Sequence, residues 1–231
     1  GRLSYEISHN DVTQDEGSPD VILEEQTGVT RVCTVEFGVR RETLDNILNP
    51  SKGTWLDLAV IPSARVIGSE FDFVTLLAEA RAFLPLGPTV VANRLRIGAT
   101  QPYASTVADE VPVVSRFFAG GSNSMRGFRY HRMPPVNATQ YNVGGTSLLE
   151  ASTELRFPVW RKLGGVLFVD TGQLNLDPFH YDVRDLFWAA GTGLRYHTVV
   201  GPLRADFGYL LNPRDTGSDP FQWFVSVGHS F

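Results

Sequence analysis

The chain has 231 residues, of which 42% are hydrophobic and 19% charged, with a formal net charge of -5. This composition is too apolar for a disordered chain, and an acidic balance without a basic cluster argues against a nucleic-acid partner. No run of about 18 apolar residues occurs, so we expect no transmembrane helix. The single cysteine, Cys33, excludes an intrachain disulfide. The N-terminus lacks a signal-peptide pattern, so we expect a mature or truncated product.

Alternating apolar and polar residues run through the first half of the chain. This period of two is typical of β-strands, whose successive side chains point to opposite faces. Strands are expected over residues 1–9, 29–40, 53–67, 71–84 and 90–100.

The segment 101–145 is a connection of about 45 residues, far longer than the usual link between strands. Its apolar content is too high for a disordered segment, because it carries Phe117, Phe118, Met125, Phe128, Tyr130 and Met133. We therefore expect this loop to pack inside the molecule.

The second half repeats the alternation more clearly. Strands are expected over 146–158, 163–171, 188–197, 202–210 and 222–231, which gives about ten in the whole chain. The last of them places Phe231 on its apolar face and Gly228 on the opposite one.

Two all-β architectures produce this pattern: a soluble sandwich, and an antiparallel transmembrane β-barrel with a polar interior. Charges of both signs on the polar faces, strands of about ten residues and the alternation of short turns with long loops favour the barrel. Aromatic residues near strand ends are typical of interfacial girdles; they are Trp55, Trp160, Trp188, Tyr196, Tyr209 and Trp223.

The most specific signal is RFFAGGSNSMRGF at residues 116–128, followed by RYHRMPP. It resembles the long sixth extracellular loop of the BamA/TamA superfamily of outer-membrane assembly and secretion barrels, with Met125-Arg126-Gly127-Phe128 as the loop tip. Further segments are similar to family motifs in the family's order: Asn49–Gly53, Glu154–Pro158, Phe168–Gly172, Gly191–Arg195 and Val200–Phe207. The resemblance covers residues 29–231.

This resemblance implies that residues 1–231 are one barrel domain with 101–145 as a loop inserted into the lumen. The family barrel has sixteen strands, five of them after this loop. Five are expected here as well, but only about five precede the loop. The chain is then either a fragment that lacks six or so strands and the periplasmic POTRA domains, or a shorter relative.

The resemblance also implies a site. An arginine inside a barrel must be paired, because an unpaired buried charge is costly. In the family the loop arginine bonds acidic residues on the following strands, so we expect Arg126 to pair with Glu154, Asp170 or both. The remaining predicted functional residues are Gly120, Gly121, Gly127 and Phe128 in the loop, and Gly228 and Phe231 in the last strand.

The function implied is insertion or export of other β-barrel or autotransporter-type proteins at the bacterial outer membrane, without ATP. Partners would be outer-membrane lipid, client proteins and a periplasmic or inner-membrane accessory protein. The segment Phe221–Phe231 would form one half of a laterally opening seam, with Gly228 as its weak point. No enzyme, metal or cofactor pattern stands out. Alternatives are a two-partner secretion pore and the anchor of a surface-displayed patatin-like phospholipase.

Overall fold

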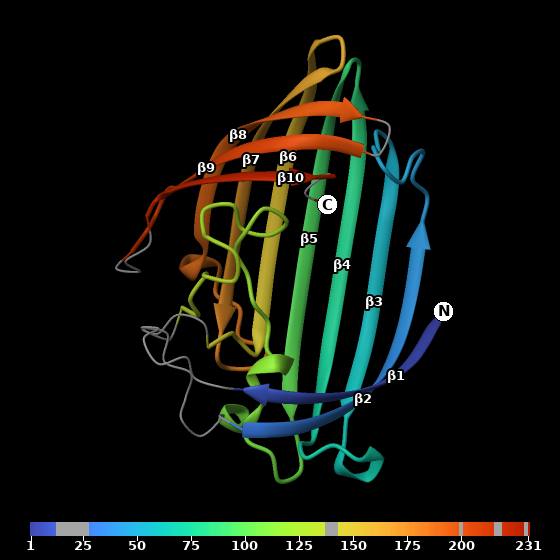
Figure 1. Cartoon of the computed structure of the whole chain (residues 1–231), viewed down its shortest axis with the longest axis vertical. Helices are drawn as coiled ribbons and strands as arrows, with labels where there is room; N and C mark the ends of the chain where they lie inside the picture. Colours follow the sequence, from blue (N-terminus) through green and yellow to red (C-terminus); the bar gives the residue numbers. More distant parts are fainter. Residues whose placement is uncertain (13–27, 137–142, 199–200, 215–218, 229–230) are drawn as a thin grey trace.

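Ten antiparallel strands form one sheet in which each strand pairs with the next along the chain (Figure 1). The structure is a computed structural model that describes residues 1–12, 28–136, 143–198, 201–214, 219–228 and 231. The strands are β1 (Arg2–Val12), β2 (Gly28–Glu42), β3 (Gly53–Ser63), β4 (Phe73–Leu86), β5 (Thr89–Pro102), β6 (Ser147–Trp160), β7 (Leu163–Asn175), β8 (Phe187–Thr198), β9 (Gly201–Leu210) and β10 (Phe221–Val227). The predicted all-β fold and strand number are confirmed. No pairing between β1 and β10 is present in the described part of the chain, so the sheet is open.

The short 3-10 helices lie in the connections: η2 (Arg65–Ile67), η3 (Ala108–Glu110), η4 (Val113–Ser115) and η5 (Val183–Asp185). Within the described residues, no helix has the length and apolar character needed to cross a membrane.

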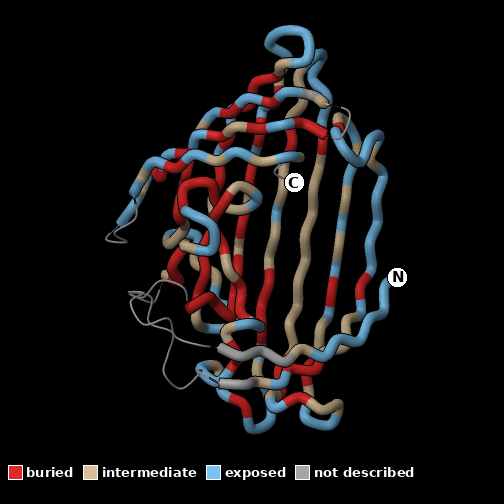
Figure 2. Tube along the Cα trace, in the orientation of Figure 1, coloured by how far each residue is buried: buried red, intermediate tan, exposed pale blue. Residues whose placement is uncertain are grey.

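The sheet is curved, and its two ends bend toward the same side (Figure 1). We call the concave side the inner face. The strands place most of their charged and small residues there and exposed apolar residues on the outer face, as the alternation predicts, although large apolar residues such as Phe83 and Phe168 also face inward. On β7, for example, Asp170 is buried while Leu167 on the outer face is 50% exposed. Figure 2 shows this alternation of buried and exposed positions along β6 and β7.

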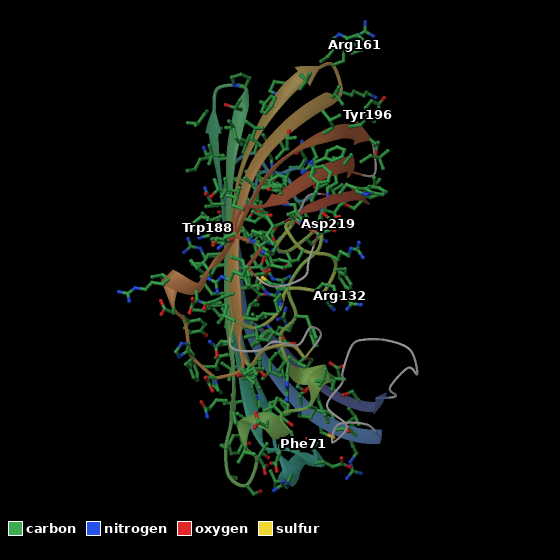
Figure 3. The ribbon with its side chains drawn as sticks, turned by 90° about the vertical axis from the view of Figure 1, so that its left-hand side faces the viewer. Phe71, Arg132, Arg161, Trp188, Tyr196 and Asp219 are labelled. Carbon is green, nitrogen blue, oxygen red and sulfur yellow. The ribbon has the colours of Figure 1, made fainter. Side chains whose placement is uncertain are left out.

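The short β4–β5 and β6–β7 turns lie at one end of the sheet together with the β2–β3 connection, residues 43–52, and the β3–β4 and β5–β6 connections lie at the other. Figure 3 shows Arg161, in the turn between β6 and β7, at one end and Phe71, in the connection from β3 to β4, at the other. The longest connection of the described chain joins β5 to β6 and lies against the inner face (Figure 1). One isolated bridge joins Phe117 to Gly145 within the connection, and another joins Pro135 of the connection to Leu174 on β7. Residues 137–142 of this predicted loop lie outside the described residues.

One aromatic residue, Trp55, departs from the predicted arrangement. Trp55 lies on the inner face rather than in an outer girdle, stacked between Arg81 at 4.2 Å and Arg40 at 5.0 Å from its ring centroid. Such cation–π contacts suit an indole among polar side chains.

The last strand is shorter than predicted, and Phe231 is not on the outer apolar face. β10 ends at Val227, and Gly228 follows with φ of 96°. This left-handed conformation interrupts the period of two. Phe231 is buried instead, with its ring 6.3 Å from that of Phe83 on the inner face.

Candidate functional site

The tip of the β5–β6 connection is a tight turn built on two glycines. Gly120 and Gly121 have φ of 104° and 106°, which glycine adopts without strain. A Cβ at Gly120 would lie 2.4 Å from the carbonyl oxygen of Arg129. The Gly120 amide donates to Ser124 Oγ at 2.9 Å, and the Phe128 amide donates to the Met125 carbonyl at 3.2 Å. Together they fix the direction in which the intervening Arg126 leaves the loop.

Arg126 is fully buried and contacts both acids that the alternation placed on the inner face. Its guanidinium grips Asp170 on β7 bidentately, with Nε donating at 2.8 Å and Nη2 at 2.7 Å. Nη1 donates to Glu154 Oε1 on β6 at 2.5 Å, and the Arg126 backbone amide donates to Asp170 at 3.1 Å. Paired donors in a planar fork match a carboxylate better than a lysine ammonium would.

Two further residues complete this pocket and were not singled out from the sequence. Ser152 Oγ donates to Asp170 Oδ1 at 2.6 Å and accepts from Arg126 Nη2 at 3.2 Å. The ring of Phe168 lies 3.4 Å from the guanidinium carbon. Both residues alternate in phase with Glu154 and Asp170, so the shared face was the available signal.

The charges in this pocket alternate in sign. Glu154 accepts from Arg126 through one oxygen and from Arg156 Nε through the other at 2.8 Å. Burial lowers the pKa of the Arg126 guanidinium, but the carboxylates of Asp170 and Glu154 raise it by more, so the net pKa is above its usual value. The loop arginine therefore stays charged, and its removal would leave the buried Asp170 without this cation, while Glu154 would keep its contact with Arg156.

Gly127 and Phe128 place the rest of the tip against β8 and β9. A Cβ at Gly127 would lie 2.8 Å from Ala189 Cβ, so only glycine fits this contact without movement. The Phe128 ring is fully buried and meets Phe187 edge-on, with centroids 5.1 Å apart. This apolar contact excludes water beside the ion pairs and strengthens them.

The backbone of the tip also lies against β9. A Cβ at Gly208 would be 2.2 Å from the Arg126 carbonyl oxygen, so this strand approaches the loop as closely as a backbone can. Arg94 on β5 donates to the Asn123 carbonyl at 2.7 Å, and Ser124 Oγ donates to Glu150 on β6. The tip is thus held by contacts from β5 to β9.

The two predicted residues at the end of the chain lie apart from the loop tip. The Gly228 amide donates to the Pro202 carbonyl at 2.8 Å, and among the described residues other than its chain neighbours no heavy atom lies within 4 Å of where its Cβ would be. The Phe231 ring is 5.4 Å from the guanidinium carbon of Arg156, which in turn binds Glu154. Phe231 therefore reaches the loop pocket only through two intermediate side chains.

The chemistry of this site is electrostatic anchoring. Within the described residues, no three or more His, Cys, Asp or Glu side chains gather in a way that could hold a metal ion. The arginines and carboxylates of the pocket are committed to one another, which suits the fixing of a loop.

Comparisons with known proteins place the chain among outer-membrane barrel proteins. The chain is 29% identical over 220 residues to the outer membrane protein assembly factor BamA of Nitratidesulfovibrio vulgaris, a match that covers 91% of this chain and 27% of that protein. It is 31% identical over 170 residues to a SAM50-like protein of Schizosaccharomyces pombe, covering 68% of this chain and 33% of that protein. The chain therefore spans about a third or less of these curated relatives.

A solved structure shows the same fold. BamA from Haemophilus ducreyi lacking POTRA domains 1–3 matches with a TM-score of 0.71 at 18% sequence identity, over 89% of this chain and 44% of that one. The model of the Omp85 superfamily domain matches residues 1–231. The chain therefore belongs to the Omp85 superfamily of outer-membrane β-barrel proteins.

Proposed function

We propose that this domain inserts or exports other proteins at the outer membrane, with β-barrel or autotransporter-type proteins as its clients and without ATP. The observation that carries the proposal is the loop tip held by Arg126 between Glu154 and Asp170, in a chain similar to an outer membrane protein assembly factor. In the complete protein, a periplasmic or inner-membrane accessory protein would deliver clients to this domain.

The last strand, β10, supplies the place where a client strand would pair. Within the described residues β10 pairs only with β9, so its other edge carries backbone donors and acceptors without strand partners. Such an edge templates the addition of a strand, because each added residue gains main-chain hydrogen bonds. Strand addition releases free energy by itself, which is why no nucleotide hydrolysis is needed.

The weakness of the β10 edge favours its opening. The strand is seven residues long, and the left-handed Gly228 ends it. A short seam has fewer hydrogen bonds to break than one formed by a strand of ten or more residues. We propose that the anchored loop meanwhile keeps the interior of the barrel occupied.

The test is to lock the seam. In the full-length protein, Val225→Cys on β10 is paired with a cysteine placed opposite it on the first strand, in a background with Cys33→Ala so that the native thiol cannot compete. Oxidation is expected to stop client insertion, and reduction to restore it. Val225→Cys without its partner is the matched control.

The outcome also separates the alternatives. Unchanged client insertion by the fully oxidised protein would refute a seam at β10. Continued secretion of a soluble exoprotein through the locked barrel would instead favour a two-partner secretion pore, whose path runs through the lumen.

A further inference from the structure

Arg204 on β9 contacts the loop tip and the last strand at the same time. Its Nε donates to Ser226 Oγ on β10 at 2.5 Å. Its Nη2 donates to Asn123 Oδ1 at 2.6 Å and to the Ser122 carbonyl, both in the loop tip. One guanidinium thus joins two segments that are about a hundred residues apart in the chain.

The acceptors around Arg204 differ from those around Arg126. Its side chain is fully buried, yet its carboxylate neighbour, Asp206, is 3.5 Å away. The shorter contacts are to neutral oxygens of the loop and of β10. A buried cation with few acceptors loses much when one leaves, because the desolvation cost is no longer offset.

The shape of the guanidinium makes these contacts interdependent. It is a rigid plane, so the bond from Nε to Ser226 fixes the direction in which Nη2 points. That direction is toward Asn123 and Ser122. Forming the first contact already restricts the long side chain, so the second contact forms with little further loss of conformational entropy. The two contacts are therefore cooperative.

We propose that Arg204 is a positioning residue that couples the seating of the loop tip to the position of β10. When β10 moves, the guanidinium loses Ser226 and its hold on Asn123 loosens; when the loop leaves, β10 loosens in turn. This inference deepens the proposed function, since it rests on β10 being the moving strand of the seam.

The experiment measures backbone hydrogen exchange of the full-length protein in lipid vesicles, with no client present. Ser226→Ala removes the acceptor on β10 and is expected to raise exchange in the loop tip, residues 120–128, by roughly three- to tenfold. Asn123→Ala in the loop is expected to raise exchange in β10 by a similar factor, because coupling between two sites is reciprocal. Val225→Ala, on the outer face of the same strand, is the control and should leave the loop unchanged.

The coupling must also depend on the arginine. In an Arg204→Gln background, Ser226→Ala should no longer change exchange in the loop tip. Should Arg204→Gln prevent folding, the two alanine variants still decide the matter. A Ser226→Ala protein with wild-type exchange in the loop would overturn the proposal. Because no client is involved, this result stands apart from the seam-locking test, which alone decides the proposed function.

Discussion

Replacing Asp170 by asparagine tests what holds the loop. Asp170 accepts two hydrogen bonds from the Arg126 guanidinium and one from its backbone amide. Asparagine has the same shape, but it carries no charge, and its amide nitrogen would face Nη2 or Nε, donor against donor. Glu154 would remain as the one carboxylate in direct contact with Arg126.

The expected magnitude follows from burial. Removing one partner of a buried ion pair costs about 3–5 kcal/mol, and the remaining contact with Glu154 favours the lower value. At about 1.4 kcal/mol for each factor of ten, the unseated population should rise by roughly a hundredfold or more. This estimate concerns the equilibrium between seated and released loop, with the strands intact.

Trypsin cleavage after Arg126, which is fully buried while the loop is seated, measures that population in membrane-embedded protein. When reseating is faster than cleavage, the cleavage rate tracks the released fraction. The control is Asp185→Asn, whose carboxylate is 50% exposed and 3.5 Å from Arg214. A surface pair of this kind contributes about 0–1 kcal/mol. Cleavage of Asp170→Asn at the wild-type rate would refute the anchoring argument.

Three further predictions follow from single contacts. Gly208→Ala would place a Cβ 2.2 Å from the Arg126 carbonyl oxygen, so tryptic cleavage of the loop should accelerate; an unchanged rate would contradict the close contact. Phe231→Ala should lower the thermal unfolding temperature, because truncating a buried phenylalanine costs about 3–5 kcal/mol, and an unchanged temperature would place this ring in solvent. Hydrogen bonds from Ser51 lower the pKa of Asp45 to about 2. The stability they give the β2–β3 turn should be complete above pH 4 and lost as the pH falls toward 2, as amide NMR of Ser51 would show.

The anchoring pocket was accessible to sequence reasoning because alternation is local. A period of two fixes the faces of Glu154 and Asp170 without knowledge of the register between strands. The glycines around Arg126 marked the turn that presents it. Both acids contact the arginine in the structure, and the strand pairing places β6 beside β7, as their order in the chain suggests.

Other contacts could not be predicted, because they depend on the register between segments that are distant in the sequence. Nothing in the sequence near Gly208 indicates that the loop backbone rests on it. The position of Ser226 beside Arg204 depends on the β9–β10 register, in which these two residues are directly opposed. The alternation placed Phe231 on the wrong face, because Gly228 adopts a left-handed conformation and the strand ends before Phe231.

The seat of the loop tip has a consequence for the order of events when this chain is made. Asp170 follows Arg126 by 44 residues, and Arg204 follows Ser122 by 82. The loop tip therefore precedes most of its seat in the chain. The tip can dock only after β6 to β9 have paired. A docked tip therefore shows that the strands following it in the chain have already formed their part of the sheet. A substitution that disrupts the pairing of β9 would then be detected first as a loop tip that does not dock.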